Sequence, residues 1–237
     1  MESSLLIIVP VCNQGSQIEK ILPLLEELNH DILMIDDGST DNTYEIIKDQ
    51  QWLAYIKHEM NLGFGASIIT GYEYARDLNY ETIIILGIKN TKFKEEISAL
   101  MENISYGYEI VTSSRILENY SFQDIPPDFI AMTSDLSLTL REITGFDITD
   151  PLSGILAIRT DVLKDMELTE FNHCLLLQLW IQAHYFGLSI IEIPAQSGIG
   201  FGDELTIYDD PMGLFLAHME TEKILYPKKI IEESSGD

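Results

Sequence analysis

The stretch that decides the fold runs from Ile32 to Asp41 and reads ILMIDDGSTD. Its first four residues are apolar and predict a buried strand, which the acids Asp36 and Asp37 follow directly. A helix should begin near Thr40–Asp41, where Asp41 can cap the exposed amides. Acids in this place can accept hydrogen bonds from a base or a sugar hydroxyl. An ordinary strand-to-helix turn with a capping acid would show the same pattern.

Strand and helix patterns alternate on both sides of this stretch. The alternation favours an α/β fold with a mostly parallel central sheet and helices on both faces, in which ligands bind beyond the carboxyl ends of the strands. The expected strands are Leu5–Val9 (ending at Pro10), Ile32–Ile35, Leu53–Lys57, Thr82–Leu86, Glu109–Ser113, Ile155–Arg159 and Leu188–Ile193. The later expected helices are Lys94–Asn103, Ile130–Ile143, Leu175–Phe186 and Pro211–Leu225.

The charge of the chain excludes some classes of partner. Among 237 residues there are 39 acids against 14 lysines and arginines, giving a net charge of −25. Such a chain repels nucleic acid and anionic membrane surfaces, and nucleic acid is not an expected partner. A phosphorylated ligand would also be repelled unless a cation or a helix N-terminus compensated locally.

The sequence predicts a single cytoplasmic domain over residues 1–231, followed by a flexible tail at 232–237. The N-terminal stretch MESSLLIIVP has no basic region, so it does not predict a signal peptide. No apolar run approaches the ~18 to 20 residues that a transmembrane helix requires. The two cysteines, Cys12 and Cys174, are expected to be free thiols in a reducing compartment.

Several segments beyond the acidic stretch resemble one enzyme family. Ile7–Asn13 comes one strand–helix unit earlier, and Asn61-x-Gly63-x-Gly65-Ala66 comes one unit later. With Asp36–Asp41 between them, this ordered set resembles the family 2 glycosyltransferases, in particular the dolichyl-phosphate mannose synthase-like branch. Over about residues 5–205, three further segments are similar to motifs of that family: Ile110–Arg115 (with Ser113 in place of a glycine), Asp150–Ile155 and Gly187–Pro194.

The resemblance implies a GT-A fold and a set of site residues. It implies that a UDP or GDP type of nucleotide-diphospho-sugar is bound by Pro10, Asn13, Asp36, Asp37, Gly63 and Arg115. It also places Asp150 where the family has its proposed base for the acceptor hydroxyl, although Asp150 also fits a turn that precedes Pro151. Arg115 and Arg159 would meet phosphate or pair with surface acids. We interpret Gly63 and Gly65 as a turn that permits close packing, because the third glycine of a dinucleotide-binding fingerprint is missing.

At three places this chain lacks charged residues that the family carries. Its metal-binding Asp-x-Asp is replaced by Gly87-Ile88-Lys89, and its Asn-Glu by Asn13-Gln14. The loop Gln196–Thr206 contains neither of the basic residues that steady phosphate in the family. Because Mg²⁺ is bound chiefly through carboxylates and substrate phosphates, the sequence predicts no metal site and no cofactor. Lys89 is the candidate to replace the metal charge as a catalytic group, or else it belongs to a solvated loop with Lys92.

Two functional interpretations therefore remain open, and the sequence leaves it uncertain whether the chain is an enzyme. In the first, it transfers a sugar from a nucleotide-diphospho-sugar to an unknown acceptor, with an activity that is impaired or independent of metal. In the second, it is a non-catalytic relative that binds a nucleotide, a sugar or a protein partner.

Overall fold

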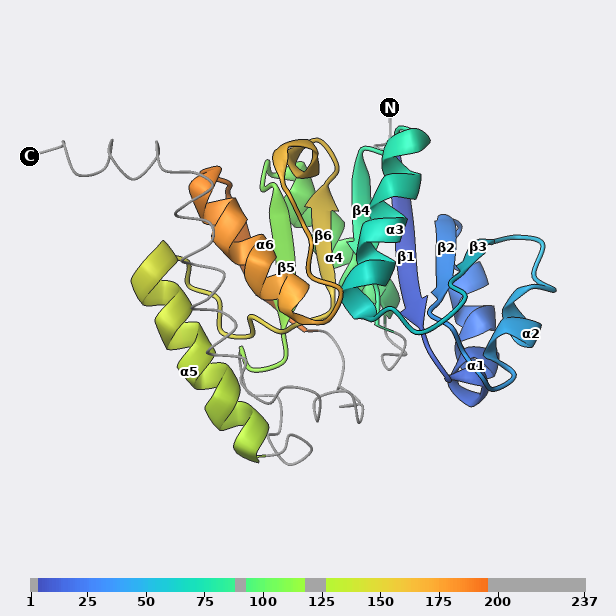
Figure 1. Cartoon of the computed structure of the whole chain (residues 1–237). Coiled ribbons are helices and arrows are strands. Elements are labelled where there is room, and N and C mark those ends of the chain that lie inside the picture. Colours follow the sequence, from blue (N-terminus) through green and yellow to red (C-terminus); the bar gives the residue numbers. More distant parts are fainter. Residues whose placement is uncertain (1–3, 88–92, 118–126, 196–237) are drawn as a thin grey trace, which may run out of the picture.

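The computed structural model describes residues 4–87, 93–117 and 127–195. Within these ranges the chain forms one seven-stranded sheet with the strand order β3-β2-β1-β4-β6-β5-β7 (Figure 1). Every pairing is parallel except the two that β6 makes, with β4 and β5. The strands are β1 Leu5–Val11, β2 Asp31–Asp36, β3 Ala54–Lys57, β4 Thr82–Ile85, β5 Ile110–Ser114, β6 Leu156–Arg159 and β7 Ile190–Pro194. The expectation of a mostly parallel α/β sheet is confirmed.

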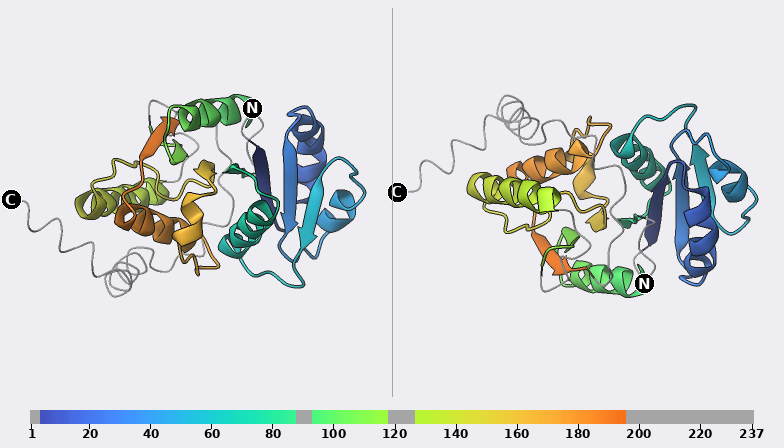
Figure 2. Two further views of the ribbon diagram at one scale, coloured as in Figure 1. Left: turned by 90° about the horizontal axis from the view of Figure 1, so that it is seen from above. Right: turned by 90° about the horizontal axis from the view of Figure 1, so that it is seen from below.

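Helices cover both faces of the sheet, as the views along the strands in Figure 2 show. The helices are α1 Gly15–Glu26, α2 Thr43–Ile47, α3 Phe64–Asp77, α4 Phe93–Ser105, α5 Pro127–Thr144 and α6 Cys174–Tyr185, with a 3-10 turn η2 at Val162–Asp165. One buried cluster joins the sheet to α1, α2 and α4, and the other joins it to α3, α5 and α6. None of the helices in the described ranges is long and apolar enough to span a membrane.

The predicted strand end at Pro10 is wrong, because Pro10 lies inside β1. It pairs with Ile35 of β2, whereas the last pair between β1 and β4 is Ile8 with Ile85. The amide of Leu86 donates to Ile8 and the amide of Asp37 donates to Val11, so hydrogen bonds from successive β1 residues alternate between β4 and β2. By this alternation Pro10 faces β4 beyond the end of that ladder, where its missing N–H costs no hydrogen bond.

The remaining differences are small or lie outside the described residues. Pro23 lies within α1, and the helix expected to start near Thr40–Asp41 begins at Thr43. The expected helix Pro211–Leu225, the loop Gln196–Thr206 and the tail at 232–237 all fall outside the described ranges.

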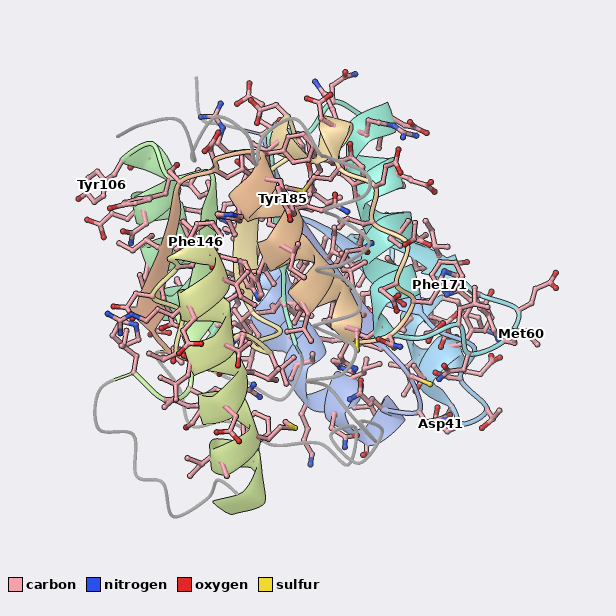
Figure 3. All side chains as sticks on the ribbon, turned by 60° about the vertical axis from the view of Figure 1, so that its left-hand side comes forward. Asp41, Met60, Tyr106, Phe146, Phe171 and Tyr185 are labelled. Atoms are coloured by element: carbon pink, nitrogen blue, oxygen red, sulfur yellow. The ribbon has the colours of Figure 1, made fainter. Side chains whose placement is uncertain are left out.

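Two glycines bring the start of α3 against the backbone of residues 170–172. A Cβ on Gly63 would come within 2.2 Å of the Phe171 carbonyl oxygen, and one on Gly65 within 2.2 Å of the Glu170 oxygen. The same Phe171 oxygen accepts a hydrogen bond of 3.1 Å from the Ala66 amide, and the Phe171 side chain stands exposed beside it (Figure 3). The turn therefore permits close packing, as expected, although the packing partner is a loop.

We expect Gly65→Ala to lower the free energy of unfolding by about 1–2 kcal/mol. Alanine should gain about 1 kcal/mol of helix propensity in α3, but a methyl group pressed against two backbone carbonyls costs more, as overpacking does. Gly154→Ala is the matched control, because its Cβ would meet only the Phe64 ring at 3.6 Å. Urea denaturation of both variants measures the difference. A Gly65→Ala protein more stable than the control would contradict the close packing.

Candidate functional site

The predicted site residues meet at one edge of the sheet. Asp36 ends β2 and Asp37 follows it, at the same level as Val11 of β1. Gly87 follows β4 at this edge. The antiparallel pairing of β6 with β4 brings the turn that begins at Asp150 to the same edge. The carboxyl ends of β5 and β7, at Ser114 and Pro194, also lie there.

Asp37 is a buried acceptor that joins two strands to a helix. Its Oδ1 contacts His58 Nδ1 at 2.8 Å and accepts from the Leu62 amide at 2.9 Å. Its Oδ2 accepts from the Gly63 amide at 2.8 Å. His58 Nε2 in turn contacts the Thr70 hydroxyl on α3 at 3.0 Å. In this arrangement both Asp37 oxygens already hold the loop that leads from β3 into α3.

Asp36 accepts fewer hydrogen bonds from the described residues than Asp37 does. It is 1% exposed, and its Oδ1 accepts from the Ser39 amide at 3.0 Å. Its Oδ2 accepts no hydrogen bond from the described part of the chain, and Lys57 Nζ stands 4.0 Å away. The Lys57 ammonium also lies 4.0 Å from the centre of the Tyr44 ring. A buried carboxylate oxygen without a hydrogen-bond donor is costly, so this atom would gain from a donor brought to it by a ligand.

Asn13 shapes the loop that follows Asp36 and Asp37. It adopts a positive φ of 52°, and its side-chain oxygen accepts from the Thr40 and Asp41 amides at 2.8 and 3.2 Å. Asp41 caps two helices at once: it accepts from the Thr43 amide at 2.9 Å and from the Gly15 amide at 3.1 Å. Burial opposes ionisation of Asp41, but hydrogen bonds from Thr43 and Gly15 outweigh it and lower the pKa of the carboxyl. The capping role expected of Asp41 is therefore present.

Asp150 and Arg115 form a buried ion pair at the other end of the edge. Asp150 is 0% exposed, and its oxygens accept from Arg115 Nε at 2.5 Å and Nη2 at 2.8 Å. The Arg115 backbone amide adds a third bond to Asp150 at 3.1 Å, and Nη2 also donates to the Leu152 carbonyl. The guanidinium lies over the Phe129 ring, 4.8 Å from its centre. Arg115 therefore pairs with an acid, although the acid is buried and not the surface acid that was expected, and its expected contact with phosphate stays a prediction.

The sequence reasoning overlooked Glu192 of β7 as a site residue. Its carboxylate accepts from the Thr149 amide at 2.8 Å, from the Thr149 hydroxyl at 2.7 Å and from the Asp150 amide at 2.9 Å. Burial raises the pKa of Glu192 and outweighs the hydrogen bonds that lower it. Ser114 completes the link from β5 through a contact of 2.7 Å with the Thr149 hydroxyl. Glu192 could have been found from the sequence, because it is an acid in the otherwise apolar strand of the Gly187–Pro194 segment.

Two further residues, Arg159 and His173, each contact another side chain of the protein. Arg159 lies at the opposite end of the strands, where it pairs with Thr82 at the start of β4. It forms an ion pair of 3.1 Å with Asp161. His173 stacks on the Phe64 ring at the start of α3, with 4.4 Å between ring centres.

The described residues do not fit a divalent metal. Among them no group of three or more His, Cys, Asp or Glu side chains is placed to hold an ion. Gly87 has open space where a Cβ would stand, with no atom within 4 Å. Lys89, the proposed replacement for the metal charge, lies outside the described ranges, as does Ile88.

Comparisons with known proteins agree with this geometry. The chain is 28% identical over 176 residues to a UDP-N-acetylglucosamine–dolichyl-phosphate N-acetylglucosaminyltransferase of Methanococcus voltae, covering 67% of this chain and 70% of that protein. It is 23% identical over 223 residues to a dolichol-phosphate mannosyltransferase of Pyrococcus furiosus, covering 90% of this chain but only 62% of the relative.

The same fold occurs in a solved structure. Mannosyl-3-phosphoglycerate synthase from Rubrobacter xylanophilus matches with a TM-score of 0.66 at 14% identity, over 93% of this chain and 75% of that one. A family model described as glycosyl transferase family 2 matches residues 6–166, which is most of the described sheet. Together with the edge built from β1, β2 and β3, this match shows that the chain belongs to glycosyl transferase family 2 and has the GT-A fold of nucleotide-sugar transferases.

Proposed function

We propose that the protein binds a nucleoside diphosphate sugar at the ends of β1, β2 and β3 and transfers the sugar without a divalent ion at residues 87–89. The observation that carries the proposal is the buried Asp36 Oδ2, which accepts no hydrogen bond from the described residues. Uracil and guanine both offer a ring N–H that such an oxygen can accept, so a UDP or GDP type of donor fits. Membership of a nucleotide-sugar transferase family supports the same assignment.

Asp36→Asn is therefore expected to weaken binding of UDP or GDP by about 1.5–3 kcal/mol, the range for a hydrogen bond to a charged group. Asparagine keeps the size of the side chain and can keep the bond from the Ser39 amide. Asp77→Asn is the control, because Asp77 is exposed and forms its ion pair with the neighbouring Arg76. Titration calorimetry measures both. If the unmodified protein bound neither nucleotide, the proposal would fail at its first step.

The names of two relatives support one class of acceptor. The two named above are, by their names, transferases that act on dolichyl or dolichol phosphate. We extend this to the present chain and take a polyprenyl phosphate as its acceptor.

Transfer without a metal needs another charge on the leaving diphosphate, because stabilising that charge is usually the largest catalytic term. Lys89 stands in the sequence where the family has its second metal-binding acid. A lysine can act there as a point charge on phosphate. A protonated Lys89 would also repel a divalent ion, by ~1 kcal/mol per unit charge at 4 Å in water and several times more in a partly buried site.

We expect sugar transfer by the unmodified protein to be unchanged by EDTA, to be abolished by Lys89→Ala and to be kept in part by Lys89→Arg.

The double change Gly87→Asp, Lys89→Asp should create Mn²⁺ affinity, since a side chain at position 87 has open space to occupy. Mn²⁺ titration monitored by electron paramagnetic resonance checks the gain. Metal-dependent turnover by the unmodified protein would show that other acids bind the ion.

A second candidate function is favoured by one observation. Both oxygens of Asp150 are engaged by Arg115, and the carboxylate has no exposed surface. A polyprenyl phosphate presents an anionic oxygen that needs no base, whereas an acceptor hydroxyl needs one within hydrogen-bond reach, so with a hydroxyl acceptor this pair has to open before Asp150 can act. A pair that stays closed leaves Asp150 no role as a base, and a non-catalytic binding module of the same family is then the alternative function that we consider.

Asp150→Asn separates these two roles. If Asp150 only holds Arg115, the variant should lose about 3–5 kcal/mol of stability, because it leaves a guanidinium that is 13% exposed facing an uncharged amide. Any transfer activity would then fall only in step with the folded fraction. If Asp150 is the base, turnover per folded molecule should disappear. Thermal denaturation measured alongside the transfer assay distinguishes the outcomes.

A further inference from the structure

The side chain of His58 is enclosed where β3 ends and the loop toward α3 begins (Figure 1). It is 9% exposed, and both of its ring nitrogens have a partner. Nδ1 lies 2.8 Å from Asp37 Oδ1, and Nε2 lies 3.0 Å from the hydroxyl of Thr70. Thr70 belongs to the second turn of α3, so the ring connects the acidic turn after β2 to a helix. With so little exposed surface, the ring acts on a ligand only through the groups that it contacts.

The surroundings of Asp37 decide which ring nitrogen of His58 carries the proton. The Asp37 carboxylate also accepts from the Leu62 amide at 2.9 Å and from the Gly63 amide at 2.8 Å. Because an ionised carboxylate is only an acceptor, the ring nitrogen that faces it must be the donor. In a neutral ring the lone pair is then on Nε2, where it accepts from the Thr70 hydroxyl. The contacts therefore fit the tautomer that carries its proton on Nδ1.

Residues 58–63 form a wall beside the proposed nucleotide site. A Cβ on Gly38 would come within 2.2 Å of the Met60 backbone carbon and 2.4 Å of the Asn61 backbone nitrogen, so this loop packs directly on the turn after β2. The Asn61 side chain reaches the segment after β1, where it donates to Cys12 Sγ at 3.2 Å. The position of this one loop therefore sets the shape of the edge formed by the ends of β1 and β2.

We propose that His58 is a positioning residue for the nucleotide. Thr70 holds the imidazole in its Nδ1–H form, the imidazole orients the Asp37 carboxylate, and the carboxylate fixes residues 58–63 through its bonds to two amides. The terminal torsion of an aspartate is broad, so the direction of its oxygens is set by their partners and not by a rotamer. The effect on the nucleotide rests on the proposed function, whereas the tautomer and the state of the loop do not.

Nitrogen-15 spectra of the histidine rings in the full-length protein test the tautomer without any substitution. At mildly alkaline pH the His58 ring should show its hydrogen on Nδ1 and a lone pair on Nε2. A hydrogen on Nε2 alone, or on both nitrogens, would overturn the proposal, because the ring would then not accept from Thr70.

The variants His58→Asn and His58→Gln separate the two contacts of the ring. Asparagine places its amide group near the position of Nδ1 and can still donate to Asp37, whereas the longer glutamine reaches toward Thr70 and removes that donor. Titration calorimetry with UDP and GDP should show His58→Asn within about threefold of the unmodified protein and His58→Gln weaker by about tenfold or more, since the lost hydrogen bond is to a charged group.

The pair Thr70→Val and Thr70→Ser tests the outer contact. Valine removes the hydroxyl at nearly the same size, so Thr70→Val should weaken nucleotide binding and shift the amide signals of Leu62 and Gly63. Thr70→Ser keeps the hydroxyl and should do neither. His30→Gln is the control for loss of a histidine, because His30 is exposed and directly precedes β2 at the opposite end of the strands.

The outcomes distinguish this proposal from the proposed function. If the unmodified protein binds a nucleotide and a folded His58→Gln protein binds it equally well, His58 is not a positioning residue. If His58→Gln does not fold, equal binding by Thr70→Val and Thr70→Ser overturns the proposal in its place. If the unmodified protein binds neither UDP nor GDP, the proposed function fails, and the amide signals of Leu62 and Gly63 in Thr70→Val still decide whether His58 positions the loop.

Discussion

The Asp37 carboxylate is the interaction on which the rest of the edge depends. It draws together the end of β2, His58 after β3 and the amides of Leu62 and Gly63 that open α3. A buried acid in this place is stable only because its oxygens accept hydrogen bonds, and removing it would strand several donors at once. The loop it holds then presents Gly63 and Gly65 to the backbone of residues 170–172. The two halves of the chain are therefore joined at the edge where the nucleotide is proposed to bind.

In the second half of the chain, an ion pair and a buried glutamate hold the same edge of the sheet together. Glu192 binds the backbone at Thr149 and Asp150, and Asp150 in turn fixes Arg115. Burial raises the pKa of Glu192, and the neighbouring charge of Asp150 helps to raise it further. Trp180 of α6 secures the turn by donating to the Pro151 carbonyl at 2.8 Å. Rigidity at this end comes from a connected network of polar groups, in which each member depends on the next.

The sheet could be predicted from the sequence because its signals are local. Runs such as Ile32–Ile35 are apolar and short, and acids and glycines mark where they end. Pro10 misled the prediction, because whether a proline is tolerated in a strand depends on which neighbour the missing N–H would face, and that is a property of the finished sheet. The partners of Asp150 and Glu192 could not be foreseen for the same reason. Arg115 is 35 residues from Asp150, and Glu192 is 42 residues from it, so no periodicity in the chain connects them.

The loops after β1, β2 and β3 differ from the segment after β4 in how many contacts a substitution would disturb. The proposed nucleotide end is held by three side chains that accept from backbone amides: Asn13 from Thr40 and Asp41, Asp41 from Gly15 and Thr43, and Asp37 from Leu62 and Gly63. A substitution there disturbs helix starts and strand ends together. Position 87, by contrast, follows β4 with open space around it, and no described neighbour depends on a side chain there. The side chain at position 87 can therefore change without disturbing the loops that we propose to recognise the base. The geometry of those loops is set by hydrogen bonds of Asn13, Asp37 and Asp41 with the backbone, and none of these bonds involves position 87.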